Sequence, residues 1–169
     1  TDAEKTSTLA NITPTQSMEE GLKDVSLAVE AATENQNIKL KIFESMDKFA
    51  PASCILASNT SSISITALAA ETKRPDFVIG MHFMNPVPVM RLVEVIRGAR
   101  TSDATCDAVK ALCARLGNYT LGWCHDALRF RCGWPVRLKV IRRTIEKPAG
   151  LSVMWTEVWY RSASPISRT

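Results

Sequence analysis

Short apolar runs alternate with segments whose apolar residues recur every three or four positions between residues 22 and 118. The short runs are typical of buried strands, and the wider spacing is typical of amphipathic helices. Residues 1–16 are polar, so we expect a loose or weakly helical segment there. The pattern predicts strands over 25–29, 55–58, 77–83 and 92–96, and helices over 38–50, 63–72 and 103–116.

Local signals mark where the predicted helices begin and end. Ser17 and Glu20 have the spacing of a capping box, which predicts a short helical turn over 17–23. Pro51 ends the helix that starts at residue 38, because proline cannot continue the backbone hydrogen-bond ladder. Gly117 ends the last helix, since glycine adopts the left-handed conformation that often follows a helix.

The alternation of short strands and helices favours an α/β fold with a mostly parallel sheet covered by helices. The chain has 169 residues, of which 46% are hydrophobic and 22% charged, which is ordinary for one globular domain with its own core. No apolar run approaches the roughly 20 residues of a membrane span, so we expect no membrane association. The five cysteines form no CxxC pair, which argues against a zinc site and favours a reducing, intracellular compartment. Cys106 and Cys113 lie seven positions apart on a predicted helix, which indicates core packing.

The net charge of +4 is divided unevenly along the chain. Residues 1–118 carry 12 Lys or Arg and 14 Asp or Glu, whereas residues 119–169 carry 9 and 3, together with all four tryptophans. This shift predicts a boundary at 118, with residues 1–118 as one unit and 119–169 as an unassigned basic tail. The tail has three interpretations: an out-of-frame or misjoined segment that does not fold, a basic tail that binds nucleic acid or anionic surfaces, or a genuine extension. Its basic patch is modest, so we expect no nucleic-acid partner.

Two polar clusters interrupt the apolar runs and are candidates for chemistry. The run Ser58-Asn59-Thr60-Ser61-Ser62 follows a predicted strand directly, and the carboxyl ends of strands are where open α/β sheets bind ligands. His82 and Glu94 lie twelve residues apart with a proline-containing turn between them, so two strands could bring them side by side. A histidine that accepts a proton near neutral pH works best with a carboxylate that orients it.

These clusters together resemble the 3-hydroxyacyl-CoA dehydrogenase family, especially its 3-hydroxybutyryl-CoA dehydrogenase branch. The resemblance covers residues 22–118 and is strongest where the Ser58–Ser62 run combines with the block His82-Phe83-Met84-Asn85-Pro86-Val87-Pro88-Val89-Met90. It implies NAD as the cofactor, an acyl-CoA substrate and no metal. It also implies catalytic roles for His82, Glu94 and Ser61, and cofactor-binding roles for Glu34, Lys39, Asn59 and Asn85.

The resemblance also shows where this sequence departs from the family. No G-x-G-x-x-G turn occurs, so we expect a partial Rossmann-like fold that lacks its first βαβ half. Nothing after residue 118 resembles the C-terminal helical domain of the family. The implied function is NAD-dependent oxidation of an L-3-hydroxyacyl-CoA to the 3-oxoacyl-CoA. The alternatives are an inactive truncated or pseudogene-like fragment and a related hydroxyacid dehydrogenase.

The resemblance carries expectations about assembly and location as well. Intact members of the family are usually homodimers. The protein would be cytoplasmic in a bacterium, or peroxisomal or mitochondrial in a eukaryote.

Overall fold

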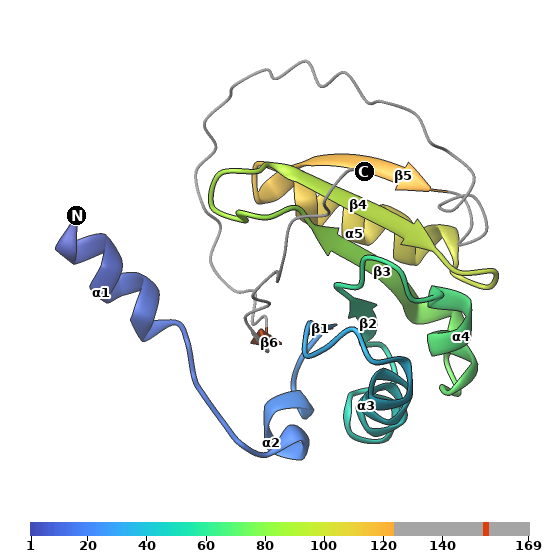
Figure 1. The fold of residues 1–169 in the computed structure, drawn as a ribbon. Helices are drawn as coiled ribbons and strands as arrows, with labels where there is room; N and C mark the ends of the chain where they lie inside the picture. Colours follow the sequence, from blue (N-terminus) through green and yellow to red (C-terminus); the bar gives the residue numbers. More distant parts are fainter. Residues whose placement is uncertain (124–153, 156–169) are drawn as a thin grey trace, which may run out of the picture.

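The computed structural model describes residues 1–123 and 154–155. Helices and strands alternate along most of this part of the chain (Figure 1). The helices are α1 (Asp2–Ala10), α2 (Met18–Leu22), α3 (Gln36–Phe49), α4 (Ile65–Ala70) and α5 (Asp103–Arg115), with a 3-10 turn at Pro75–Phe77. The strands are β1 (Leu27–Glu30), β2 (Ile55–Ser58), β3 (Val78–Phe83), β4 (Leu92–Arg97), β5 (Tyr119–Trp123) and β6 (Met154–Trp155).

These strands form one sheet in the order β5-β4-β3-β2-β1-β6. Neighbouring strands run parallel except β3 and β4, which are antiparallel. Because β1, β2 and β3 are parallel, their carboxyl ends lie at one edge of the sheet, where Glu30, Ser58 and Phe83 close the three strands. The sheet therefore offers the edge at which α/β proteins of this kind bind ligands.

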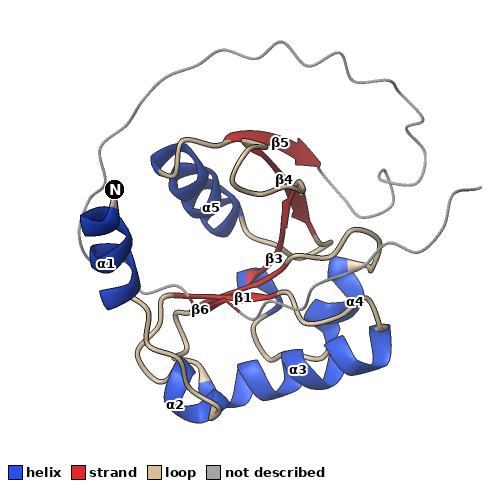
Figure 2. Cartoon of the chain, turned by 60° about the vertical axis from the view of Figure 1, so that its left-hand side comes forward, coloured by secondary structure: helices blue, strands red, loops and turns tan. Residues whose placement is uncertain are grey.

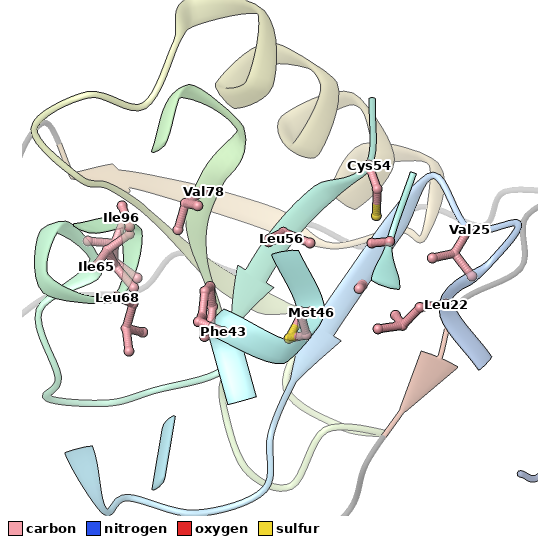
Figure 3. Packing of buried hydrophobic residues seen from close by; sticks show 13 residues of the cluster. Leu22, Val25, Phe43, Met46, Cys54, Leu56, Ile65, Leu68, Val78 and Ile96 are labelled. Carbon is pink, nitrogen blue, oxygen red and sulfur yellow. The ribbon is translucent and has the colours of Figure 1, made fainter. Parts of the chain in front are cut away.

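Helices cover both faces of the sheet (Figure 2). Helices α2, α3 and α4 pack on one face through a core that includes Leu22, Phe43 and Leu68 (Figure 3). Helix α5 covers the other face, where Cys106, Val109 and Cys113 contact the strands. The predicted α/β, Rossmann-like class with a mostly parallel, doubly wound sheet is confirmed. None of the described helices is long and apolar enough to cross a membrane.

The predicted elements are present, with ends displaced by a few residues. Helix α3 begins at Gln36 rather than residue 38, because the Asn35 side chain accepts a hydrogen bond from the Ile38 amide. Helix α4 is shorter than predicted and starts after the Ser64 cap. Gly117 has φ 75° and follows α5, as expected. The N-terminal segment differs more, since a capping box between Thr1 and Glu4 starts a regular helix, α1, that buries no residue.

Strand β5 carries the sheet past the predicted boundary at residue 118. It pairs in parallel with β4 from Leu92↔Tyr119 to Ile96↔Trp123. The first five residues assigned to the tail are therefore part of the sheet. The helix or strand expected around 136–145 lies outside the described residues, and the division of the chain into two units stays a prediction.

Candidate functional site

The antiparallel pairing of β3 with β4 brings His82 and Glu94 together. The two residues are direct partners in the ladder, so both side chains leave the sheet on the same face. The His82 Nδ1 atom lies 2.8 Å from Glu94 Oε2. Both side chains are more than four-fifths buried, at 18% and 15% exposure. The hydrogen bond expected from the twelve-residue spacing is present, and it fixes the ring of His82 against a carboxylate.

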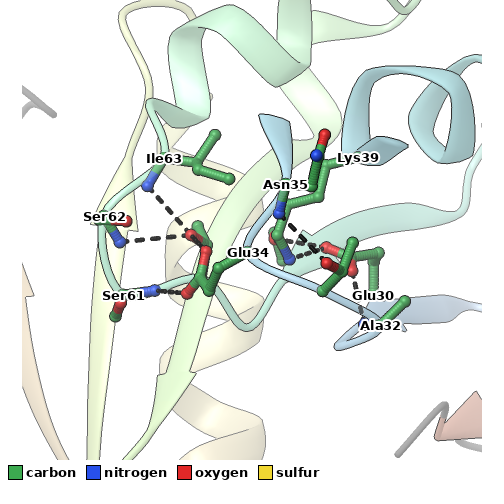
Figure 4. Close-up of polar contacts among 11 residues, drawn as sticks. Glu30, Ala32, Glu34, Asn35, Lys39, Ser61, Ser62 and Ile63 are labelled. Carbon is green, nitrogen blue, oxygen red and sulfur yellow. Dashed lines mark hydrogen bonds and ion pairs between the residues drawn. The ribbon is translucent and has the colours of Figure 1, made fainter. Parts of the chain in front are cut away.

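A second carboxylate, Glu34, holds the loop that follows β2 (Figure 4). Its Oε1 accepts the Ser61 amide at 2.6 Å, and its Oε2 accepts the Thr60 hydroxyl at 2.7 Å. The Thr60 hydroxyl oxygen also accepts the amides of Ser62 and Ile63. Two predicted site residues, Glu34 and Ser61, are therefore in direct contact although 27 residues separate them in the sequence.

These contacts determine how Glu34 titrates. Burial by itself would raise the pKa of Glu34, but the hydrogen bonds from the Ser61 amide and from the hydroxyls of Thr60 and Ser61 outweigh it, together with the charge of Lys39. The net result is a pKa of Glu34 below its ordinary value of 4.5. The folded state therefore favours the charged carboxylate.

We expect the Glu34 contacts to stabilise the fold at neutral pH and to fail in acid. Because folding lowers the pKa of Glu34, the stabilisation is complete when the pH is above the pKa of Glu34 in the unfolded chain. It disappears as the pH falls through the lower pKa that Glu34 has in the folded protein. Replacing Glu34 by glutamine should therefore lower the free energy of unfolding at pH 7 but have little effect below the folded pKa. Denaturant titrations of both proteins across this range measure the difference. A loss that does not vary with pH would contradict this account.

Lys39, on helix α3, is enclosed by protein. Its ammonium contacts Glu30 Oε2 at 2.5 Å and Ser58 Oγ at 3.5 Å, and Lys39 and Glu30 are each only 1% exposed. The Ser58 hydroxyl donates to the same Glu30 oxygen at 2.8 Å. In this structure the Lys39 ammonium is therefore held by Glu30 and Ser58. The expected place of Lys39 in the cofactor groove stays a prediction.

Asn59 and Asn85 both lie at the carboxyl edge of the sheet but differ in burial. Asn59 is half-buried, and its Oδ1 accepts the Phe83 amide at 2.8 Å, so it joins the end of β2 to the end of β3. Asn85 is exposed in the loop that follows β3. The structure thus links Asn59 to the strand that carries His82, and cofactor contacts by either asparagine stay predictions.

Three further residues, all buried, take part in these networks: Glu30, Ser58 and Thr60. Ser58 and Thr60 belong to the polar run that the sequence offered, although neither was given a role of its own, whereas Glu30 was not singled out. An acid that closes the apolar run Leu27-Ala28-Val29 is the signal that could have identified Glu30, because a charged residue at the end of a buried strand needs a partner. Its partner was less evident, since Lys39 follows nine residues later on a different element.

Other reactive groups in the described part of the chain carry no second site. Cys54, Cys106 and Cys113 are free and buried, and burial raises the pKa of the Cys113 thiol to about 11, which keeps it protonated. This agrees with the core packing expected of Cys106 and Cys113. Across residues 1–123 and 154–155, no group of three His, Cys, Asp or Glu side chains is arranged to hold a metal ion.

A family model matches the chain over residues 1–126. It describes the NAD binding domain of 3-hydroxyacyl-CoA dehydrogenase. The chain belongs to this family. The match includes β5 and the carboxyl edge that bears His82, Asn59 and Glu34. NAD is accordingly the cofactor of this domain.

Individual members of the 3-hydroxyacyl-CoA dehydrogenase family support this membership. The chain is 49% identical over 117 residues to a probable 3-hydroxybutyryl-CoA dehydrogenase of Bacillus subtilis, covering 69% of the chain and 40% of that protein. It is 51% identical over 107 residues to a 3-hydroxybutyryl-CoA dehydrogenase of Clostridioides difficile, covering 63% and 38%. The solved (S)-3-hydroxybutyryl-CoA dehydrogenase of Ralstonia eutropha superposes with a TM-score of 0.70 at 53% identity, covering 72% of the chain and 43% of that structure. The chain thus spans about 40% of the length of the Bacillus subtilis and Clostridioides difficile proteins.

Proposed function

We propose that this 3-hydroxyacyl-CoA dehydrogenase domain serves the NAD-dependent oxidation of an L-3-hydroxyacyl-CoA to the 3-oxoacyl-CoA. The observation that carries the proposal is the 2.8 Å contact between His82 Nδ1 and Glu94 Oε2 at the carboxyl edge of the sheet. A histidine paired in this way is suited to exchange a proton with a hydroxyl group near neutral pH.

In this proposal His82 is the general base. With Nδ1–H donating to Glu94, the other ring nitrogen, Nε2, holds the lone pair that accepts the proton of the substrate's 3-hydroxyl. Glu94 then faces the positive charge that forms on the ring and stabilises it. The chemistry that bound NAD would supply is acceptance of the hydride from C3, which would leave a carbonyl at that carbon and yield NADH.

The remaining predicted residues divide between substrate and cofactor. On substrate binding, the Ser61 hydroxyl would turn from Glu34 and donate to the 3-oxygen of the substrate. Glu34 would hold the Ser61 loop in place through the Ser61 amide at 2.6 Å and the Thr60 hydroxyl at 2.7 Å. Asn85 would approach the ribose or carboxamide of the nicotinamide. Lys39 would support the cofactor side of the site indirectly, by fixing Glu30 and Ser58 at the ends of β1 and β2.

The relatives support a proposal for the substrate and the setting. Proteins about 50% identical to this chain are named for 3-hydroxybutyryl-CoA, which favours a short acyl chain. We propose action on an acyl-CoA, assembly of the complete protein as a homodimer, and a cytoplasmic location as expected for bacterial relatives.

The test is NADH formation from NAD and (S)-3-hydroxybutyryl-CoA by the purified protein. The His82→Gln variant should be about 100- to 10,000-fold slower, while its affinity for NADH, measured by fluorescence, stays unchanged. Glu71→Gln, on an exposed residue after α4, is the matched control and should not alter the rate. No NADH formation by the unmodified chain would favour the alternative of an inactive fragment. Turnover restricted to hydroxyacids without CoA would favour the related hydroxyacid dehydrogenase.

A further inference from the structure

Strand β3 extends past the end of its neighbour β2. The register between the two strands stops at Ser58↔Gly80, whereas β3 continues through Phe83. On the other side, β4 pairs with β3 up to Phe83↔Val93. Among the described strands, the last three residues of β3, which include His82, therefore have a partner on one side alone.

The Asn59 side chain replaces the missing strand at this point. Its Oδ1 accepts the Phe83 amide at 2.8 Å, on the side of β3 that faces away from β4. The next amide, that of Met84, points the other way and donates to the Leu92 carbonyl of β4 at 3.3 Å. One side-chain hydrogen bond thus extends the β2–β3 ladder beside His82.

The backbone of Asn59 is hydrogen-bonded as well. Its backbone amide donates to the Glu30 carbonyl at 2.7 Å, which anchors it to β1. Within two residues of it, Ser61 is fixed by Glu34. Asn59 therefore connects two parts of the edge: the loops that carry Glu34 and Ser61, and the hairpin that carries His82 and Glu94.

We propose that Asn59 is a positioning residue that sets His82 relative to the Glu34–Ser61 loop through the Phe83 amide. This differs from the direct cofactor contact that the family resemblance implies for Asn59, and it rests on the proposed function of His82 as the general base. A hydrogen bond of this kind matters because small displacements of a proton-accepting group lower the rate strongly.

The test compares Asn59→Ala with Asn59→Asp in the full chain. Aspartate keeps an oxygen that can accept the Phe83 amide but loses the amide NH₂ with which Asn59 could contact a cofactor. In Asn59→Ala, the Phe83 amide should exchange with solvent about 10-fold faster, consistent with the net contribution of one hydrogen bond, and the ring nitrogen resonances of His82 should move. In Asn59→Asp both signals should stay near their original values. Ser102→Ala, which removes the same kind of side-chain bond at the start of α5, is the control and should leave Phe83 and His82 unchanged.

Activity adds a second readout. Asn59→Ala should lower kcat with little change in KM for NAD, and Asn59→Asp should restore kcat. Equal weakening of NADH binding in both variants would overturn the proposal in favour of a direct cofactor contact. Unchanged Phe83 exchange and His82 resonances in Asn59→Ala would overturn it as well. Because these two signals do not require turnover, they decide the role of Asn59 even if the chain fails to reduce NAD.

Discussion

Replacing Lys39 by methionine is expected to lower the free energy of unfolding by about 3–5 kcal/mol, the usual effect of breaking a buried ion pair. The ammonium lies 2.5 Å from Glu30 Oε2, and both side chains are 1% exposed. Without Lys39, the Glu30 carboxylate would stay enclosed, with the Ser58 hydroxyl and the Ala32 amide as its remaining donors in the described part of the chain. Denaturant unfolding followed by circular dichroism measures the loss.

Two further variants separate the lost charge pair from other effects of the substitution. Lys41→Met changes an exposed lysine of the same helix and should alter stability by less than about 0.5 kcal/mol. Adding Glu30→Gln to Lys39→Met removes the unpaired charge and should recover a large part of the loss. Equal losses in Lys39→Met and Lys41→Met would show that the buried pair contributes nothing to stability.

Replacing Gly80 by alanine is expected to destabilise the protein by about 1–3 kcal/mol, the usual effect of inserting a methyl group into a filled core. A Cβ atom at Gly80 would lie 2.8 Å from the Cβ of Ile96 and 3.1 Å from the Cδ1 of Ile65. The Cβ of Ile96 is attached directly to the backbone of β4, so the strand itself must move. Since β4 also carries Glu94, the contact with His82 should be disturbed, which the His82 ring resonances would report.

Gly122, on β5 at the other side of β4, offers a matched comparison. A Cβ atom there would meet only the Cε of Lys110, at an ordinary 3.8 Å. Gly122→Ala should therefore be neutral, or stabilising by up to about 1 kcal/mol through the reduced freedom of the unfolded chain. If both glycine variants lose stability to the same extent, the cause is the loss of glycine in a strand and not the contact with Ile96.

The sequence predicted the parts of this structure that depend on neighbouring positions. His82 and Glu94 could be paired in advance because twelve residues with a turn between two strands leave few other arrangements. The helix ends were predictable within a few residues, and the differences arise from caps at Asn35 and Ser64 that tighten the first turns.

Other parts depend on contacts between distant segments and could not be predicted. The sequence offers Lys39 as a charge on an amphipathic helix, and only the packing of α3 against β1 and β2 places it beside Glu30. The role of Asn59 depends on β3 being longer than β2, a difference of a few residues that hydrophobic patterns do not resolve. The division of the chain at 118 relied on composition, and composition does not indicate that residues 119–123 form a strand, β5, that pairs with β4.

The antiparallel β3–β4 pair has a consequence for the order of folding. His82 and Glu94 are twelve residues apart, whereas the parallel partners Leu27 and Ile55 are separated by 28. Loop closure becomes entropically more costly by about 0.6 kcal/mol for each doubling of length, and contacts close in sequence form sooner than distant ones. We therefore expect the hairpin to form before the parallel strands associate, so that His82 and Glu94 are brought together while the carboxyl edge of the parallel strands is still unstructured. Substitutions in this hairpin should then slow folding, whereas substitutions in β1 should mainly accelerate unfolding.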